Sequence, residues 1–168
     1  MSLEGLLARA FGMSDEVWSR HANPWSVWTR FAILPLLVPA VWSRVWIGWW
    51  AVVPVAVLCA WAWLNPRAFP RPRTTRTWAS KAVLGERVWL ERKKVPIPPA
   101  HRAAPHLLSA LSALGLPFLV WGLIALAPWP TAFGLGFVIL GKLWFLDRMV
   151  WLYEDMVDAD PRYRGWLY

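Results

Sequence analysis

Residues 131–153 read TAFGLGFVILGKLWFLDRMVWLY, an apolar run long enough to cross a bilayer as one helix. Lys142 lies about eleven residues into this run, which places it about 17 Å deep and close to the bilayer centre. A lysine at that depth costs about 2.5 to 3.5 kcal/mol, and the Leu, Ile, Val and Phe residues from Phe133 to Leu152 contribute roughly 3 to 7 kcal/mol in the opposite direction. The run therefore predicts a transmembrane helix that needs other helices around it.

Three further apolar runs precede this one, and they lie at 24–42, 45–64 and 106–127. The first follows Asn23-Pro24, a good helix start, because Asn can cap a helix and Pro suits its first position. At about 1.5 Å per residue this run would form a helix about 28 Å long, close to the hydrocarbon thickness of about 30 Å.

Turn signals separate the four runs. Ser43-Arg44 forms a minimal turn after the first run, Asn65-Pro66 is expected to stop the second, and Pro128-Trp129-Pro130 ends the third. We therefore expect an all-α integral membrane bundle of four transmembrane helices, arranged as two hairpins in a single membrane domain spanning 1–168.

The composition excludes several other classes of protein. Hydrophobic residues make up 58% of the chain and charged residues 17%, whereas a soluble domain keeps roughly a quarter of its residues charged. The same apolar content excludes a disordered chain, and a single cysteine excludes an intrachain disulfide scaffold. A small membrane protein remains.

The formal charge of +8 lies in one internal segment. Between Asn65 and His106 there are two acidic residues, Glu86 and Glu91, and ten basic ones: Arg67, Arg71, Arg73, Arg76, Lys81, Arg87, Arg92, Lys93, Lys94 and Arg102. Because apolar runs flank this segment, its charge indicates the cytoplasmic side of a membrane rather than a nucleic-acid partner. We therefore expect the loop 65–105 and both termini to lie in the cytoplasm of a cell with an inner membrane.

The middle of the basic loop, from Thr74 to Lys94, is expected to form an interfacial helix with a moderately apolar arc interrupted by Glu86. Its partner would be the anionic inner leaflet, which Arg92, Lys93 and Lys94 would contact.

Lys142 is a candidate interaction or cofactor-binding residue because the other three runs contain no carboxylate for it. Asp147 is five residues further on, about 140° round the helix, and does not face it. The expected acceptors within the chain are the carbonyls freed by Pro35, Pro39, Pro54 and Pro117. The functional alternative is contact with a buried anion, a lipid headgroup or a partner subunit's carboxylate.

The inner end of the last run is rich in charge. Arg148 shares a face with Trp144, Trp151 and Asp155, and Asp147 shares one with Glu154. Asp147, Arg148, Glu154 and Asp155 would suit either docking against the basic loop or chelation of a metal, and the arginine content of the loop favours docking.

Candidates for a metal or a cofactor are few. A metal would need His21, His101, His106 and Asp147 to be brought together by the fold. A pigment or cofactor pocket would use Trp121 and Trp144, the two tryptophans expected deepest in the bundle, with Lys142. We find no zinc spacing, phosphate loop or Ser-His-Asp order.

Most of the 16 tryptophans are expected at the ends of the runs, where an indole ring lies among lipid headgroups. The external interface would be marked by Trp42, Trp46, Trp49 and Trp129, and the internal one by Trp25, Trp28, Trp61, Trp63 and Trp151.

Three strings, HANPWSVWTRF (21–31), LGERVWLERKKVPIPPAH (84–101) and GKLWFLDRMVWLYEDM (141–156), resemble an uncharacterised prokaryotic family of small multi-pass membrane proteins. This resemblance would cover most of the chain and implies the same four-span topology. It assigns no activity, cofactor or role to any residue.

The absence of a catalytic constellation, the minimal external loops and an unpaired Lys142 predict a non-enzymatic accessory or scaffold subunit of a larger inner-membrane complex, respiratory or photosynthetic. Ala132, Gly134, Gly136 and Gly141 would allow close helix contact within the chain or with a neighbouring subunit. The alternative is a membrane enzyme or carrier that handles a lipid, quinone or pigment at the cytoplasmic leaflet, around His21, His101, Asp147 and Arg148.

Overall fold

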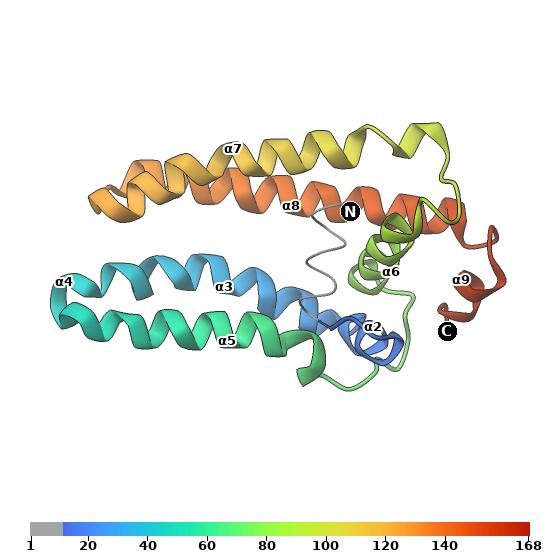
Figure 1. The fold of residues 1–168 in the computed structure, drawn as a ribbon, viewed down its shortest axis with the longest axis horizontal. Helices are drawn as coiled ribbons and strands as arrows, with labels where there is room; N and C mark the ends of the chain where they lie inside the picture. Colours follow the sequence, from blue (N-terminus) through green and yellow to red (C-terminus); the bar gives the residue numbers. More distant parts are fainter. Residues whose placement is uncertain (1–11) are drawn as a thin grey trace.

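The computed structural model describes residues 12–168, and over that range the regular structure is helical (Figure 1). The elements are α2 (Asp15–His21), α3 (Pro24–Trp42), α4 (Arg44–Ile47), η1 (Gly48–Ala51), α5 (Val52–Ala68), α6 (Trp78–Glu91), η2 (Pro99–His101), α7 (Ala104–Ala125), α8 (Pro128–Met156) and α9 (Pro161–Gly165). Helices α3 and α5 form one antiparallel hairpin, and α7 and α8 form a second (Figure 1).

The first helix of the bundle has the predicted bounds. Asn23 caps α3, and its side chain accepts a hydrogen bond from the Trp25 N–H at 3.0 Å. The turn after α3 is longer than predicted, because the chain first forms α4 and η1. Gly48 adopts a φ of 56°, a left-handed conformation that ends α4. As a result α5 begins at Val52, seven residues later than expected.

The end of α5 also differs from the prediction. We expected Asn65-Pro66 to stop the helix, but α5 continues through both residues to Ala68. Proline removes one backbone hydrogen bond, whereas the buried Asn65 side chain bonds to Ser26 at 2.8 Å and to Thr29 at 2.8 Å. These two bonds to α3 hold the last turn of α5 in helical geometry.

The second hairpin is close to its predicted bounds. Helix α7 ends before Leu126, which has a φ of 55°, and α8 begins at Pro128, three residues earlier than expected. Two expected small residues pack within the chain, since a Cβ on Gly134 would lie 2.3 Å from the Leu119 nitrogen and one on Gly141 would lie 2.9 Å from Ser112. Gly136 faces open space.

Arg44 joins the tips of the two hairpins. Its guanidinium donates to the Leu123 carbonyl at 2.8 Å and to the Ile124 carbonyl at 2.7 Å, near the end of α7. A cation is favourable there because the last carbonyls of a helix lack backbone partners and carry partial negative charge. The tip of the first hairpin is therefore fastened to the second.

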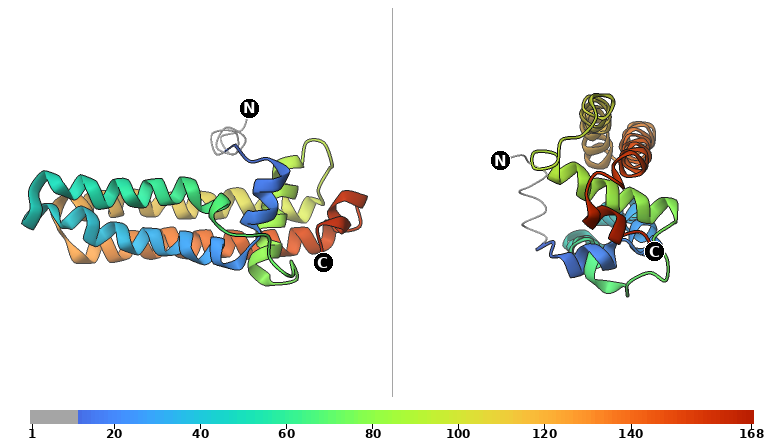
Figure 2. Two further views of the ribbon diagram at one scale, coloured as in Figure 1. Left: turned by 90° about the horizontal axis from the view of Figure 1, so that it is seen from below. Right: turned by 90° about the vertical axis from the view of Figure 1, so that its right-hand side faces the viewer.

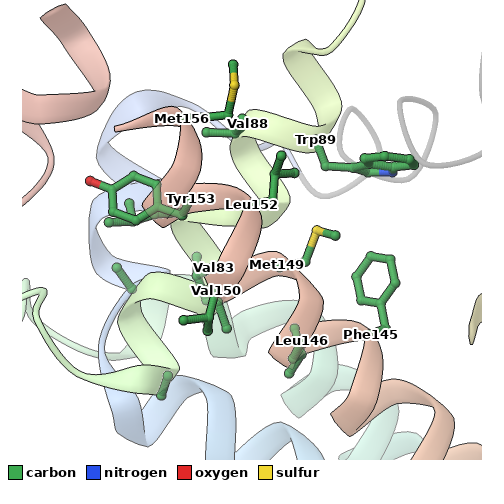
Figure 3. Packing of buried hydrophobic residues seen from close by; sticks show 14 of the residues in the cluster. Val83, Val88, Trp89, Phe145, Leu146, Met149, Val150, Leu152, Tyr153 and Met156 are labelled. Carbon is green, nitrogen blue, oxygen red and sulfur yellow. The ribbon is translucent and has the colours of Figure 1, made fainter. Parts of the chain in front are cut away.

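At the opposite end, α2, α6 and α9 form what we call the cap (Figure 2). Thr77 caps the start of α6, because its hydroxyl accepts a hydrogen bond from the Ser80 N–H at 3.1 Å, and α6 packs against α8. Figure 3 shows the apolar side chains that fill this contact. They include Val83, Val88, Trp89, Phe145, Leu146, Met149, Val150, Leu152, Tyr153 and Met156.

The burial of α6 departs from the prediction of an interfacial helix. Eight of its residues are buried, among them Ala82, Val83, Gly85 and Val88, because they pack on α8 and α2 rather than facing outward. A Cβ on Gly85 would lie 1.9 Å from the Met149 carbonyl oxygen, so the two backbones touch at this point. The helix is present, but it is part of the core of the cap.

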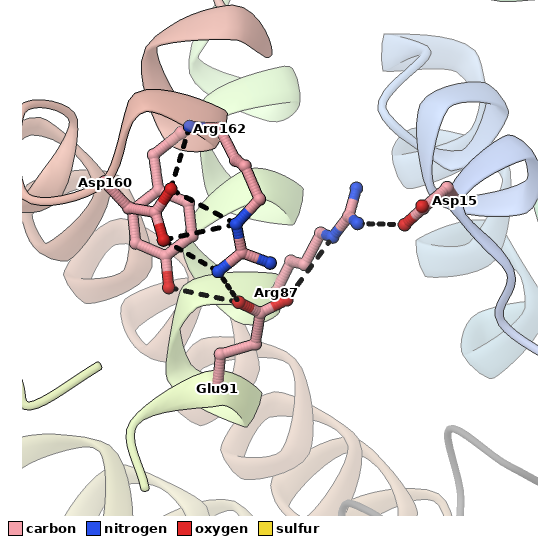
Figure 4. Close-up of polar contacts among 6 residues, drawn as sticks. Asp15, Arg87, Glu91, Asp160 and Arg162 are labelled. Carbon is pink, nitrogen blue, oxygen red and sulfur yellow. Dashed lines mark hydrogen bonds and ion pairs between the residues drawn. The ribbon is translucent and has the colours of Figure 1, made fainter. Parts of the chain in front are cut away.

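Charge pairs link the three helices of the cap (Figure 4). Arg87 of α6 forms an ion pair with Asp15 of α2, and the Arg87 guanidinium lies 4.0 Å over the Trp166 ring, which follows α9. Glu91 of α6 pairs with Arg162 of α9 at 3.3 Å. These contacts hold α2 and α9 against α6.

Within residues 12–168, three helical segments are long and apolar enough to cross a membrane, at Pro24–Ala68, Pro99–Ala125 and Pro128–Met156. The first contains both α3 and α5, which run antiparallel (Figure 1).

Candidate functional site

Four ionisable side chains meet where the cap joins the hairpins. We call them the charged cluster: His21 from α2, Arg30 from α3, Glu86 from α6 and Lys142 from α8. All four line both cavity A, of about 360 Å³, and cavity B, of about 210 Å³. The remaining described walls of cavity A are Met13, Trp18, Trp89, Leu90, Leu108, Ser109, Ser112, Gly141 and Phe145.

Lys142 has a carboxylate partner within the chain. Its ammonium donates to Glu86 Oε1 at 2.5 Å and lies 4.5 Å from the centroid of the Phe145 ring. The sequence-based expectation that proline-freed carbonyls would satisfy Lys142 was therefore wrong. The other apolar runs contain no acid, but α6 folds back from the basic segment onto α8 and brings Glu86 to Lys142.

A directional chain of hydrogen bonds fixes His21. Ser26 donates its hydroxyl proton to Asn65 Oδ1 at 2.8 Å, so the contact of 2.7 Å between His21 Nδ1 and Ser26 Oγ requires a proton on Nδ1. His21 Nε2 is then an acceptor, and Arg30 donates to it at 3.3 Å. Asn65 completes the chain by donating to Thr29. The imidazole is therefore neutral.

Burial and charge set the protonation of the two cap members of the cluster. Burial, with a further contribution from the Arg30 charge, lowers the pKa of His21 to about 3. Burial alone would raise the pKa of Glu86, but the Lys142 charge and hydrogen bond outweigh it and hold the pKa below its ordinary value of 4.5. With Arg30 and Lys142 charged, the described walls of cavity A carry two positive charges against one negative charge.

The acidic residues in the C-terminal part of α8 contact residues of the basic segment 65–105, as the arginine content of that segment led us to expect. Asp147 accepts from Trp78 Nε1 at 3.0 Å, Glu154 pairs with Lys81 at 2.7 Å, and Asp155 pairs with His101 at 2.7 Å. Arg148 lies 4.4 Å over the Trp151 ring, as their shared face suggested.

The residues proposed for a metal lie apart. His21 belongs to the charged cluster, His101 contacts Asp155, His106 packs on Trp89, and Asp147 contacts Trp78. Within residues 12–168 no group of three or more His, Cys, Asp or Glu side chains is placed to hold a metal ion.

The residues proposed for a pigment or cofactor are also separated. Trp121 on α7 is 58% exposed and Trp144 on α8 is 54% exposed. Trp144 lines an apolar hollow on the outside of α7 and α8, which we call cavity D, whereas Lys142 lines cavities A and B.

Arg30 and Glu86 belong to the site but were not predicted from the sequence. The sequence does contain a signal for Glu86, because this charged residue interrupts the apolar arc of the predicted loop helix. Arg30 was placed at the interface because it lies near the start of its run. Of the loop cations expected to contact lipid, Arg92 lies 4.1 Å over the Trp89 ring, and Lys93 and Lys94 are exposed after α6.

Comparison with known proteins yields a family but no activity. No curated protein and no solved structure matches the chain. Residues 2–165 match the family described as "Family of unknown function (DUF6653)", which agrees with the expected membership of an uncharacterised family. The chain therefore belongs to DUF6653, a family of unknown function.

Proposed function

We propose that the protein is a multi-pass inner-membrane protein that binds an anionic amphiphile, of the lipid class, in cavity A. The observation that carries this proposal is that the described walls of cavity A place two cations and one carboxylate between apolar helices. Its walls combine Arg30 and Lys142 with Trp18, Leu108 and Phe145. Such a lining fits a molecule with a charged head and an apolar body better than it fits a small soluble ion.

The proposed topology has four spans, with α3 and α5 each crossing the membrane once. The cap and both termini lie on the cytoplasmic side, because the basic segment 65–105 includes α6. Trp46, Trp49 and Trp129, each more than 75% exposed at the hairpin tips, suit the external interface. Cavity A then lies at the depth of the cytoplasmic leaflet, with the exposed face of the cap toward anionic headgroups.

Binding or carriage suits the cavity better than catalysis. The two serines in its wall are engaged with backbone carbonyls, since Ser109 donates to Pro105 at 2.8 Å and Ser112 donates to Val138 at 3.0 Å. His21 accepts from Arg30 and is not next to either hydroxyl in a base–nucleophile pair.

The test is retention of an anionic lipid. Purified protein is equilibrated with phosphatidylcholine vesicles containing phosphatidylglycerol, and the phosphatidylglycerol bound per chain is measured by native mass spectrometry. Arg30→Gln is expected to weaken retention roughly tenfold, because one charged hydrogen bond is lost. Ser109→Phe, which fills cavity A without changing its charge, is expected to weaken retention as well.

Arg20→Gln is the matched control, because Arg20 lies on α2 outside the cavity and pairs with Glu16 at 2.9 Å. It should retain phosphatidylglycerol like the wild type. Unchanged retention in both Arg30→Gln and Ser109→Phe would refute binding in cavity A.

We propose as a second candidate the accessory-subunit function within a respiratory or photosynthetic complex. Lys142 is paired with Glu86 and gives this function no support, but cavity D favours it. That hollow has a volume of about 550 Å³ and is lined by Leu111, Phe137, Leu140, Leu143 and Trp144. It offers an apolar contact face to a helix of another subunit.

Purification in mild detergent tests this second candidate. The accessory function predicts one or more stoichiometric partner proteins. Gly136→Leu should release them, because Gly136 lies one helical turn before Leu140 of cavity D on α8 and a side chain there would enter open space. A single chain recovered alone from native membranes would contradict this function and leave the lipid-binding proposal standing.

A further inference from the structure

Two cavities meet at the charged cluster. His21, Arg30, Glu86 and Lys142 line both cavity A and cavity B, and no other residue of the described part of the chain lines both. The ionisable side chains therefore lie at a junction from which two otherwise separate spaces lead away.

The two cavities lead toward different hairpins. Cavity A is bounded by α7 through Leu108, whereas cavity B is bounded by α3 through Phe31. Helix α8 contributes neighbouring residues to the two spaces, Phe145 to cavity A and Leu146 to cavity B. A ligand whose head lies at the cluster therefore has two directions in which its apolar part can extend.

Both cavities extend from the cap toward the hairpin tips. Leu34 of cavity B lies one turn after Arg30 on α3, and Ser112 of cavity A lies one turn after Leu108 on α7. Both helices start at the cap and run toward the hairpin tips (Figure 1). In the proposed topology this is the direction of the acyl chains of a cytoplasmic-leaflet lipid, because the chains lie in the hydrocarbon core and the headgroup lies at the surface.

Cavity B is apolar apart from the charged cluster. Its remaining described walls are Val27, Phe31, Leu34, Val83 and Leu146. A polar group among these side chains would lack hydrogen-bond partners, and a water molecule there would be no better satisfied. An alkyl chain is the occupant that these walls accept without that cost.

We propose that the ligand of the charged cluster is a two-chain anionic lipid, with its phosphate at the cluster, one acyl chain in cavity A and the other in cavity B. This inference rests on the proposed function, to which it adds the number of chains. Lys142 can bind the head beside its ion pair, since its ammonium has three N–H donors and Glu86 accepts one of them. A single-chain amphiphile would fill one cavity and leave the walls of the other without contacts.

The experiment compares two lipids with the same headgroup and different numbers of acyl chains. The protein is placed in phosphatidylcholine nanodiscs that contain equal mole fractions of phosphatidylglycerol or lysophosphatidylglycerol, and the bound lipid is counted by native mass spectrometry. The wild type is expected to retain phosphatidylglycerol roughly fivefold more tightly, because the second chain adds packing contacts with the helices. Equal retention of the two lipids would overturn the inference and leave binding of an anionic amphiphile in cavity A standing.

Leu34→Trp tests cavity B, because the larger side chain takes up space in it. It is expected to lower retention of phosphatidylglycerol to near that of lysophosphatidylglycerol, and to leave the single-chain lipid, which needs only cavity A, unaffected. Phe31→Trp adds a smaller volume to the same cavity and should cause a smaller loss with the same selectivity. Leu36→Trp is the matched control on α3, because Leu36 is 52% exposed and lines neither cavity, and it should keep the wild-type preference.

Two results with these variants would also overturn the inference: a full preference for phosphatidylglycerol in both Leu34→Trp and Phe31→Trp, or equal losses in Leu34→Trp and Leu36→Trp. Arg30→Gln is expected to weaken retention of both lipids, because they carry the same head. Wild-type protein that retains neither lipid would refute the proposed function itself, so the two failures are distinguishable.

Discussion

Replacing Gly85 with alanine is expected to lower the stability of the protein by about 3 kcal/mol, a decrease in Tm of roughly 10 °C. The added Cβ would lie 1.9 Å from the Met149 carbonyl oxygen and 2.5 Å from its carbonyl carbon. Because these are backbone atoms of α8, no side-chain rotation relieves the clash, and α6 must move away from α8. Thermal melting of the detergent-solubilised protein by circular dichroism measures the effect.

Gly136→Ala is the matched control for this substitution. Gly136 also lies within a helix, α8, but a Cβ there would meet no other atom within 4 Å. Alanine favours a helix by up to about 1 kcal/mol over glycine, so the control should melt at the wild-type temperature or slightly above it. Equal Tm values for Gly85→Ala and the wild type would mean that α6 and α8 are further apart than described.

Glu86→Gln is expected to destabilise the protein by about 2 kcal/mol, because Lys142 loses its charged hydrogen-bond partner. Lys142→Met in the same chain should restore more than half of the loss, since the double variant leaves no unpaired lysine. The measurement is a double-mutant cycle on Tm. A double variant that is as unstable as the sum of the single variants would show that the pair does not interact.

A second ion pair between the same two helices provides the control. Lys81 of α6 and Glu154 of α8 are 2.7 Å apart, but the Glu154 side chain is 52% exposed, whereas the Glu86 side chain is 21% exposed. An exposed pair contributes about 1 kcal/mol or less. Lys81→Met and Glu154→Gln should therefore lower Tm by less than Lys142→Met and Glu86→Gln do.

The pH dependence of this pair has a definite sign. Because the pKa of Glu86 in the folded protein lies below 4.5, its contribution to stability is present above that pH and is lost as pH falls through the folded pKa. The difference in Tm between the wild type and Glu86→Gln should therefore narrow in acid.

Local signals predicted most of the helices. The bounds of α3 follow from Asn23-Pro24 and an apolar run, because a cap and a proline act on neighbouring residues only. The same reasoning failed at the start and end of α5. There Gly48 prolongs the turn, and bonds from Asn65 to α3 carry the helix past Pro66. Caps and breakers are local, whereas these bonds join residues far apart in the chain.

The composition and charge distribution of the chain were enough to predict an all-helical protein with apolar segments able to cross a membrane. The length of each apolar run and the position of the charged residues can both be read directly from the sequence. The candidate site depended on tertiary structure. Glu86 reaches Lys142 only because α6 folds onto α8, and Arg30 and His21 join them from two other helices. A hydrogen bond requires two atoms within about 3 Å of each other, and for residues 56 positions apart only the fold of the chain decides that distance.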